Sequence, residues 1–328
     1  MQHAVIMLLQ WVPYRLPQYG KNLTLSQYLM KRVQAMTNTT VKGYIFIILS
    51  AVLFGCNPLL VTFLNREGLN SISLVVLRNV LSLPFLAVIA FRQNKSLRIP
   101  LQAVPSIIKI GLVGSCITPA LLSCSYGFIA SGTATVFHFI YPAVVVLAGV
   151  LFFRERIAIS NLVSVGICVL GICLFYTPGE PLDWRGSSLA LLSGITYAIY
   201  ILQLSHFRFP QISGFLFNLS ISAVGGIVML VFCMLNGKLT LPDSLVEWLV
   251  CCLFAFVINV CAVVMFQQGT FYIGGQKASI LSTLEPITSL VVGAIVFHEV
   301  IGFRTAVGSV LVILASILIA LTDIKSGK

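Results

Sequence analysis

Charged side chains are scarce in this sequence, because Asp, Glu, Lys and Arg together make up only 9% of its 328 residues. An ordinary soluble domain has about 25% charged residues, and it could not hide this much apolar surface from water. Hydrophobic residues reach 58%, and the mean hydropathy is +1.02. The scarcity of charge excludes a water-soluble domain and predicts an integral membrane protein whose surroundings are membrane lipid.

Acidic residues are the scarcer of the two signs, with 9 Asp and Glu against 20 Lys and Arg and a net charge of +11. A basic stripe along one face would indicate nucleic-acid binding. Here the basic residues lie between apolar segments, so we expect no nucleic-acid partner. Their positions instead carry information about membrane orientation.

Motifs for metal binding and for intramembrane catalysis are also lacking. The nine cysteines are odd in number, include no CxxC and lie in apolar stretches, whereas a disulfide framework or a zinc site needs paired spacings. His298-Glu299 has no second His four residues on, and no apolar run holds an Asp away from its end. The sequence therefore predicts no metal, no cofactor and no enzyme activity, with an intramembrane enzyme as the alternative.

Ten apolar runs are long enough to cross a hydrocarbon core of about 30 Å. Backbone groups in lipid must be satisfied within the segment, so the runs are helices, and the alternation typical of a barrel is absent. We predict an all-α integral membrane protein of ten transmembrane helices. The runs are residues 43–63, 71–91, 104–124, 133–153, 160–176, 186–204, 213–235, 248–267, 278–297 and 305–322.

Residues 1–41 precede the first run and form a separate N-terminal extension. The apolar stretch 4–9 is too short to span, and Pro13 and Pro17 follow it. No small-residue cleavage site follows, which argues against a signal peptide. We expect either a cytoplasmic arm or a stretch that precedes a working start at Met36.

Lys and Arg residues gather in alternate connectors. With a cytoplasmic N-terminus, the cytoplasmic side receives fourteen of them and the outer side four, while Arg78 and Lys109 lie within or at the edge of runs. Cytoplasmic loops carry the excess of Lys and Arg. The sequence therefore predicts a multi-pass protein of the cell (plasma) membrane with both termini in the cytoplasm.

The two halves of the chain repeat one another. A shift of 144 residues superposes a Pro and a Glu that lie thirteen residues apart in each half. The coinciding pairs are Ala134/Ala278, Pro142/Pro286, Gly149/Gly293, Phe153/Phe297, Glu155/Glu299 and Ile157/Ile301. We predict repeats at residues 42–178 and 184–324.

Small residues mark the first and sixth runs at equivalent places. Ala51 and Gly55 correspond, at a shift of 143, to Gly194 and Ala198. Small residues four positions apart permit close approach of a second helix. Both runs are therefore expected to pack tightly against neighbours.

Five helices are an odd number, so the second copy enters the membrane inverted. Arg154 and Arg156 at a predicted cytoplasmic end correspond to His298 and Val300 at an outer end, where the loss of both arginines is expected. Inverted repeats are typical of secondary transporters, whose substrate site lies near the midplane between the halves.

The segments 133–155 and 277–299 each begin with small residues and continue with a central Pro, a spaced Gly and a closing Glu. With Arg78, they resemble the EamA family of the drug/metabolite transporter superfamily over about residues 42–324. The resemblance implies a central cavity lined by helices one to four and six to nine, and export of amino acids and other metabolites. The chain departs from a symmetric motif at one place, because Tyr141 stands where the second copy has Glu285.

Ionisable residues inside spans are candidate functional residues, because a charge in lipid is unfavourable without a partner or a cavity. Glu285, next to Pro286, is a candidate for binding a proton or a substrate amine. Arg78 is a candidate for a substrate carboxylate or for pairing with Glu285. A structural bond between helices is the alternative for both residues.

Further polar residues in the spans complete the candidate set. His138 and Tyr141 share a helical face and either line the cavity, with His138 able to take up a proton, or bond to a neighbouring helix. Asn57, Asn259 and Gln268 are candidates for substrate contact or for interhelical hydrogen bonds. Glu155 and Glu299 end their helices and are candidate anchors or gate contacts.

Together these features predict a secondary transporter that moves a small-molecule substrate by alternating access. We expect amino-acid-like or other small polar solutes, export, and either proton coupling or downhill movement. The chain is expected to act as a monomer or a homodimer. A non-transporting membrane receptor is the second alternative.

Overall fold

A computed structural model of the chain describes residues 25–94, 97–129, 131–153, 159–174, 183–207, 209, 212–296 and 302–326. The chain divides into two compact units, Met1–Thr39 and Thr40–Lys328, and helix α2 (Leu25–Gly55) has residues in both. Within the described ranges every regular element is a helix and none is a strand. This confirms the predicted all-α class.

Seven helical stretches are long and apolar enough to cross a membrane: Thr39–Arg66, Ser71–Gln93, Leu101–Ser125, Trp184–Ser205, Gly214–Leu235, Leu245–Ile273 and Gly275–Val296. Three further apolar helices, Ala134–Gly149, Ile159–Cys173 and Ala306–Leu318, are shorter. They fall on the fourth, fifth and tenth predicted runs. Each predicted run therefore contains an apolar helix, and seven of these have spanning length.

Five of the runs are continuous helices, and five consist of consecutive helical pieces. The continuous helices are α4 (Ser71–Asn94), α9 (Ile159–Cys173), α10 (Trp184–Ser205), α11 (Gly214–Leu235) and α16 (Phe303–Ser326). The pieces of the first, fourth and ninth runs are α2 with α3 (Asn57–Arg66), α7 (Ser131–His138) with α8 (Tyr141–Phe153), and α14 (Gly275–Leu281) with α15 (Leu284–Val296). The third and eighth runs consist of α5 (Val104–Gly111) and α6 (Thr118–Ser125), and of α12 (Leu245–Phe254) and α13 (Val263–Ile273).

The irregularities of the backbone occur at equivalent places in the two halves. A π-helical segment, Leu112–Ile117, joins α5 to α6, and a second one, Ala255–Ala262, joins α12 to α13, so the two begin 143 residues apart. The breaks that follow α7 and α14 are separated by the same interval, since these helices end at His138 and Leu281. π-Helical turns are rare in proteins and often mark functional regions. The repeat seen in the sequence is therefore also present in the backbone.

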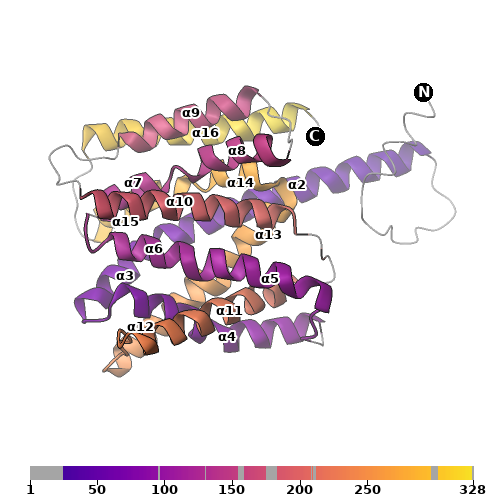
Figure 1. Cartoon of the computed structure of the whole chain (residues 1–328). Helices are drawn as coiled ribbons and strands as arrows, with labels where there is room; N and C mark the ends of the chain where they lie inside the picture. The colour runs from indigo at the N-terminus through magenta and orange to yellow at the C-terminus, as the bar shows by residue number, and fades with distance from the viewer. Residues whose placement is uncertain are drawn as a thin grey trace. The chain divides into compact units, whose positions relative to one another are not determined.

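Helices of one half pack mainly on helices of the other. Helix α4 packs along α11, and α9 lies beside α16 (Figure 1). Helix α10 contacts α6, α7 and α8, while α3 contacts α12 and α15. The interior of the second unit is therefore formed between the two halves.

The small residues predicted to allow close packing do so. A Cβ added at Gly55 would lie 2.3 Å from the Cβ of Thr288 in α15, and one added at Gly194 would lie 2.5 Å from the carbonyl oxygen of His138. Such distances are shorter than van der Waals contact, so a larger residue would push the helices apart. Helix α2 thus packs against the broken ninth run, and α10 against the broken fourth run.

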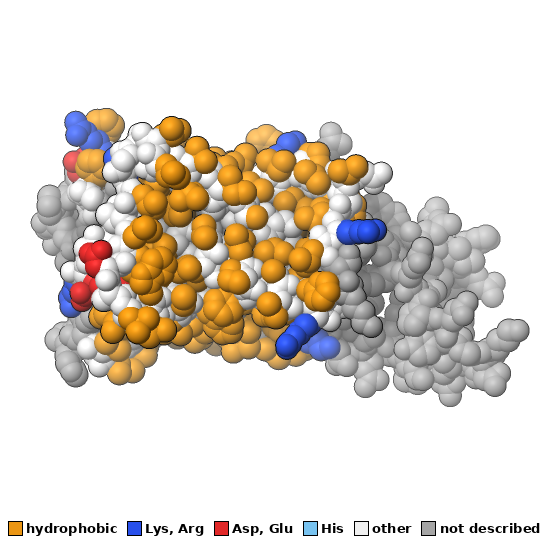
Figure 2. Space-filling view, turned by 90° about the horizontal axis from the view of Figure 1, so that it is seen from below, with side chains coloured by type: hydrophobic (Ala, Val, Ile, Leu, Met, Phe, Trp, Pro, Cys, Tyr) orange, Lys and Arg blue, Asp and Glu red, His pale blue; other side chains and the backbone are white. Residues whose placement is uncertain are grey.

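The surface of the second unit has the polarity of a membrane protein. Figure 2 shows hydrophobic side chains covering the middle of one face, with charged side chains near its two ends. Exposure of apolar residues such as Leu147, Leu170, Ile227 and Leu249 to water would be unfavourable. Lipid is the solvent that suits this surface.

Candidate functional site

Two helix breaks bring Tyr141 and Glu285 to equivalent positions inside the bundle. Tyr141 is the first residue of α8, and Glu285 lies in the first turn of α15. Each is followed by a proline, which has no N–H to donate and is well suited to the first turn of a helix. A carboxylate in the first turn also interacts favourably with the helix dipole.

Glu285 has tyrosines, and no basic partner, around its side chain. Its carboxylate lies within electrostatic range of Tyr126, Tyr141 and Tyr197. The side chain is partly exposed, although the carbonyl oxygen of Glu285 packs against Gly55. In the described part of the chain, no Lys or Arg forms an ion pair with it.

Arg78 lies in the first half of α4 and also lacks an ion-pair partner among the described residues. Its Nε atom is buried and makes no hydrogen bond. The guanidinium lies within electrostatic range of Tyr197 and Tyr200, both on α10. Arg78 and Glu285 therefore do not pair with each other in this structure, and Tyr197 lies within reach of both.

His138 and Tyr141 each hydrogen-bond to the second half of the chain. The Nδ1 atom of His138 lies 2.8 Å from the Ser193 hydroxyl, and the Tyr141 hydroxyl lies 2.6 Å from that of Ser282. Both side chains are at least nine-tenths buried. These contacts match the alternative in which the pair bonds to neighbouring helices, and Tyr141 also forms part of the surroundings of Glu285.

Asn259 lies at the centre of a buried hydrogen-bond network around the second π-helical segment. Its amide donates to the hydroxyls of Ser82 and Ser222 at 2.8 and 3.0 Å and to the Arg78 carbonyl at 3.5 Å. Its own carbonyl accepts a hydrogen bond of 2.6 Å from Asn218. The network connects α4, α11 and the segment Ala255–Ala262.

The other two amide candidates lie apart from this network. The amide of Gln268 packs over Gly214, at the start of α11, where an added Cβ would lie 2.1 Å from its nitrogen. The neighbouring Gln267 joins the network instead, since its amide donates at 3.2 Å to both Tyr200 and Asn218. Asn57 is the first residue of α3 and is partly exposed, close to the contact of Gly55 with α15.

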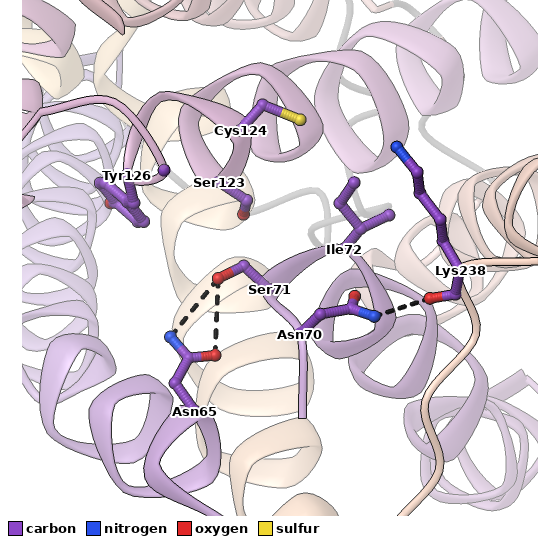
Figure 3. Close-up of a pocket in the computed structure, with 9 residues that line it drawn as sticks. Asn65, Asn70, Ser71, Ile72, Ser123, Cys124, Tyr126 and Lys238 are labelled. Atoms are coloured by element: carbon purple, nitrogen blue, oxygen red, sulfur yellow. Dashed lines mark hydrogen bonds between the residues drawn. The ribbon is translucent and has the colours of Figure 1, made fainter. Parts of the chain in front are cut away.

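A pocket of about 380 Å³ opens at the end of the second unit that carries predicted outer connectors. Figure 3 shows Asn65, which exchanges hydrogen bonds with Ser71, and Asn70, which donates to the Lys238 carbonyl at 2.7 Å. Tyr126 also lines the pocket and hydrogen-bonds to Thr135. Tyr126 also lies within electrostatic range of Glu285, which is not among the residues that line the pocket.

Aromatic side chains fill the bundle between Arg78 and the predicted cytoplasmic end. The Tyr197 ring lies 4.8 Å from Tyr141 and 5.9 Å from Phe266 between ring centroids. Further along, a phenylalanine cluster is formed by Phe207, Phe209, Phe217 and Phe271, with centroid distances of 4.6 to 6.4 Å.

Sequence reasoning missed Tyr126, Tyr197, Tyr200 and Gln267. Tyrosine is common in apolar helices, so none of these residues carried the signal that a charge in a span does. Glu155 and Glu299 lie outside the described residues. Among the described residues there is no group of three or more His, Cys, Asp or Glu side chains that could hold a metal ion.

Apolar helices that are interrupted at equivalent places in two halves are typical of a multi-pass membrane transporter. The model of the EamA-like transporter family matches residues 41–177 and 184–321. These matches cover most of the 328 residues, so the chain belongs to the EamA-like transporter family. The resemblance found in the sequence is thereby confirmed.

Curated relatives share nearly their full length with this chain. An uncharacterized transporter of Archaeoglobus fulgidus is 27% identical and aligns over 85% of this chain and 96% of its own. The uncharacterized inner membrane transporter YicL of Salmonella typhimurium is 24% identical, over 88% and 99%. The uncharacterized transporter YojE of Bacillus subtilis is 25% identical, over 79% and 87%.

Among solved structures, one crystal structure superposes with a TM-score of 0.71 and covers 87% of this chain and 99% of the other. The identity of 14% means that this likeness concerns the fold. Family and relatives together identify the chain as a multi-pass integral membrane transporter and not an enzyme.

Proposed function

We propose that this transporter exports small amino-acid-like or other small polar solutes by alternating access. The observation that carries the proposal is the presence of Arg78 and Glu285 within one bundle, each without an ion-pair partner among the described residues and both within electrostatic range of Tyr197. A charge without a partner in a low-dielectric interior has lost its hydration, and this desolvation is unfavourable by on the order of several kcal/mol per ion. A solute with an amine and a carboxylate would satisfy both groups at once.

The architecture proposed for this movement is ten transmembrane helices in two inverted repeats, residues 42–178 and 184–324. The π-helical segments and the helix breaks, 143 residues apart, support the repeat. The excess of Lys and Arg on one side supports a cell-membrane location with both termini in the cytoplasm. Because Arg78, Glu285 and Tyr197 belong to one chain, a monomer is sufficient for the site, and a homodimer is the alternative.

In this proposal the structure corresponds to a state open to the outside. The pocket next to Tyr126 lies on the predicted outer side, and the phenylalanine cluster lies on the predicted cytoplasmic side. Movement of the two repeats relative to each other would close the outer side and open the cytoplasmic side. The substrate site would then be exposed to each side in turn.

Proton coupling is proposed to act through Glu285, with His138 as the second candidate. Glu285 is partly exposed near the pocket, whereas His138 is buried and hydrogen-bonded to Ser193. Uptake into proteoliposomes with and without an imposed pH gradient tests the coupling. A rate that does not respond to the gradient would leave downhill movement as the mechanism.

The function is tested by comparing extracellular metabolites of cells that express the wild type and Glu285→Gln at matched membrane levels. A solute enriched outside only with the wild type names the substrate and supports a role for Glu285. Equal enrichment with both proteins keeps the exporter and removes Glu285 from the mechanism. Binding of a solute without any net flux would favour the receptor alternative.

A further inference from the structure

The pocket at the predicted outer end lies between the two halves of the chain. Its walls are formed by the connection from α3 to α4, the start of α4, the end of α6, and the connection from α11 to α12. The first three walls belong to the first predicted repeat and the last to the second. Neither Arg78 nor Glu285 is among the described residues that line it, so the pocket is separate from the transport site proposed above.

Hydrogen bonds between the two halves fix the wall that carries Lys238. The Lys238 carbonyl accepts hydrogen bonds from the Asn70 side-chain amide at 2.7 Å and from the Ser73 hydroxyl at 3.2 Å. Two residues on, the Thr240 N–H donates to the Ser73 hydroxyl at 2.8 Å, and the Thr240 hydroxyl accepts from the Asn70 N–H at 3.0 Å. Because Ser73 is fully buried, the backbone at Lys238 is anchored, and the pocket is formed before any ligand arrives.

The charge in the pocket is positive. Of the described residues that line it, Lys238 is the only charged one. Figure 3 shows the Lys238 side chain extending toward α6, which carries Ser123 and Cys124. No described Asp or Glu forms an ion pair with Lys238, so its ammonium group is available to a ligand. The charge therefore favours an anionic group in the pocket and disfavours a metal cation.

Hydroxyl and amide groups supply further donors. The Ser123 hydroxyl makes no hydrogen bond to a described residue. Ser71 and Asn65 exchange hydrogen bonds of 3.4 and 3.5 Å, which are longer than typical and are easily replaced by bonds to a ligand. Carboxylate and phosphate oxygens accept hydrogen bonds from such groups, and a bond from the Lys238 ammonium group is charge-assisted.

We propose that this pocket binds a small anion through carboxylate or phosphate oxygens, with Lys238 as the residue that attracts the anion and Ser71 and Ser123 as hydrogen-bond donors. The same chemistry is offered by two sources, a soluble anion on the outer side and the phosphate of a lipid headgroup. The site is independent of the solute that the transporter moves, because the residues proposed to bind that solute lie elsewhere in the bundle.

An anion in this pocket connects the two halves of the chain. Lys238 belongs to the second predicted repeat, whereas Ser71 and Ser123 belong to the first. Movement of one repeat against the other changes the separation of these walls. A ligand that binds better to one arrangement shifts the population toward it. The bound anion therefore stabilises the present arrangement over any in which the walls of the pocket are apart.

Cys124 also lines the pocket and is partly exposed, so its thiol reports on the charge there. The purified full-length protein is treated with anionic sulfonatoethyl methanethiosulfonate or with cationic trimethylammonioethyl methanethiosulfonate, and modification of Cys124 is followed by peptide mass spectrometry. After correction for the rates of the two reagents with free cysteine, the anionic reagent is expected to react at least about threefold faster. Lys238→Gln is expected to remove this preference, because the ammonium group is lost.

Protection of Cys124 identifies the source of the anion. The uncharged methyl methanethiosulfonate is applied to the protein in phosphatidylcholine nanodiscs at constant ionic strength. Phosphate and acetate, at concentrations on the order of 10 mM, are expected to slow the modification at least about threefold in the wild type and not in Lys238→Gln. If phosphatidylglycerol in the nanodiscs protects Cys124 instead, again only in the wild type, the lipid headgroup is the source of the anion.

Lys109→Gln is the matched control. Lys109 is an exposed lysine of α5 that does not line the pocket, so both the reagent preference and the protection are expected to match the wild type. The anion site is overturned if the two charged reagents react alike with the wild type, if Lys238→Gln keeps the preference, or if neither the soluble anions nor phosphatidylglycerol protect Cys124. Such a result would leave the proposed transport function standing, since Arg78 and Glu285 are unchanged in these proteins.

Discussion

The broken fourth run and the broken ninth run have the same backbone and different chemistry. Each is interrupted just before a proline, and each packs against a glycine, Gly194 of α10 in the first case and Gly55 of α2 in the second. At the equivalent position the fourth run has Tyr141, bonded to Ser282, and the ninth has Glu285, which has no ion-pair partner among the described residues. The repeat thus determines where the helices are interrupted, and a single side chain determines which half carries the charge.

The asymmetry has a physical reason. Tyr141 lies within electrostatic range of Glu285, so a carboxylate at both positions would place two like charges in one interior. Such pairs resist simultaneous ionisation. A tyrosine at the first position instead forms a hydrogen bond to the opposite half and leaves a single negative charge in the site.

The largest effect is expected when the charge is moved between the halves. Glu285→Gln removes a charged hydrogen-bond acceptor, worth about 1.5–3 kcal/mol, and is expected to lower the transport rate at least about tenfold. Adding Tyr141→Glu to this variant restores a carboxylate in the other half, but it sits on a different helix and loses the bond to Ser282. We expect no recovery in a proteoliposome transport assay.

Glu247→Gln is the matched control for this comparison. Glu247 is buried, and it accepts hydrogen bonds from the Ser244 hydroxyl and the Asp243 N–H at the start of α12. The transport rate of the Glu247→Gln variant is expected to equal that of the wild type. Full recovery in the double variant would mean that the two halves are interchangeable and would contradict the asymmetry.

The next effect concerns the glycines at the two breaks. Gly55→Ala and Gly194→Ala each introduce a methyl group where no space exists, and each is expected to lower the free energy of unfolding by about 3 kcal/mol. Thermal unfolding of the purified protein measures this. Gly166→Ala is the control, since an added Cβ there meets no atom within 4 Å, and its effect should stay within about 0.5 kcal/mol. Unequal losses at Gly55 and Gly194 would indicate that the two breaks are packed differently.

A smaller effect is expected at the asparagines that hydrogen-bond to the π-helical segments. Asn218 donates to the Asn259 carbonyl at 2.6 Å, and Asn79 donates to the Ser115 carbonyl at 3.1 Å. These two carbonyls are 144 residues apart, so each π-helical segment accepts a hydrogen bond from an asparagine at an equivalent place. An unsatisfied buried carbonyl is unfavourable by about 1–3 kcal/mol.

We expect Asn218→Ala to lower the free energy of unfolding by about 2 kcal/mol and Asn79→Ala by about 1 kcal/mol. The difference arises because Asn218 also accepts a hydrogen bond from Gln267, whereas the Asn79 side-chain oxygen has no partner. Asn236→Ala, at an exposed helix end, is the control and should change stability by less than about 0.5 kcal/mol. An equal loss for Asn79 and Asn218 would remove the distinction between the two segments.

Much of the fold was accessible from the sequence. Each predicted run contains an apolar helix, and Pro58, Pro142 and Pro286 lie at the start of helices α3, α8 and α15, as expected for a residue without an N–H. The sequence did not show which side chains of the eighth run face the interior. The segment Ala255–Ala262 is π-helical, which changes the number of residues per turn, so Gln267 and not Gln268 joins the interior network.

The sequence by itself determined that this chain is a membrane transporter of the EamA-like family and where its apolar helices lie. These properties follow from the scarcity of charge, the length of apolar runs and the internal repeat, all of which are local or periodic. Only the tertiary structure decided which residues meet, because partners such as His138 and Ser193, or Tyr141 and Ser282, lie far apart in the sequence. The rotation of each helix depends on close contacts such as that of Gly55 with Thr288, and such contacts have no signature within a single run.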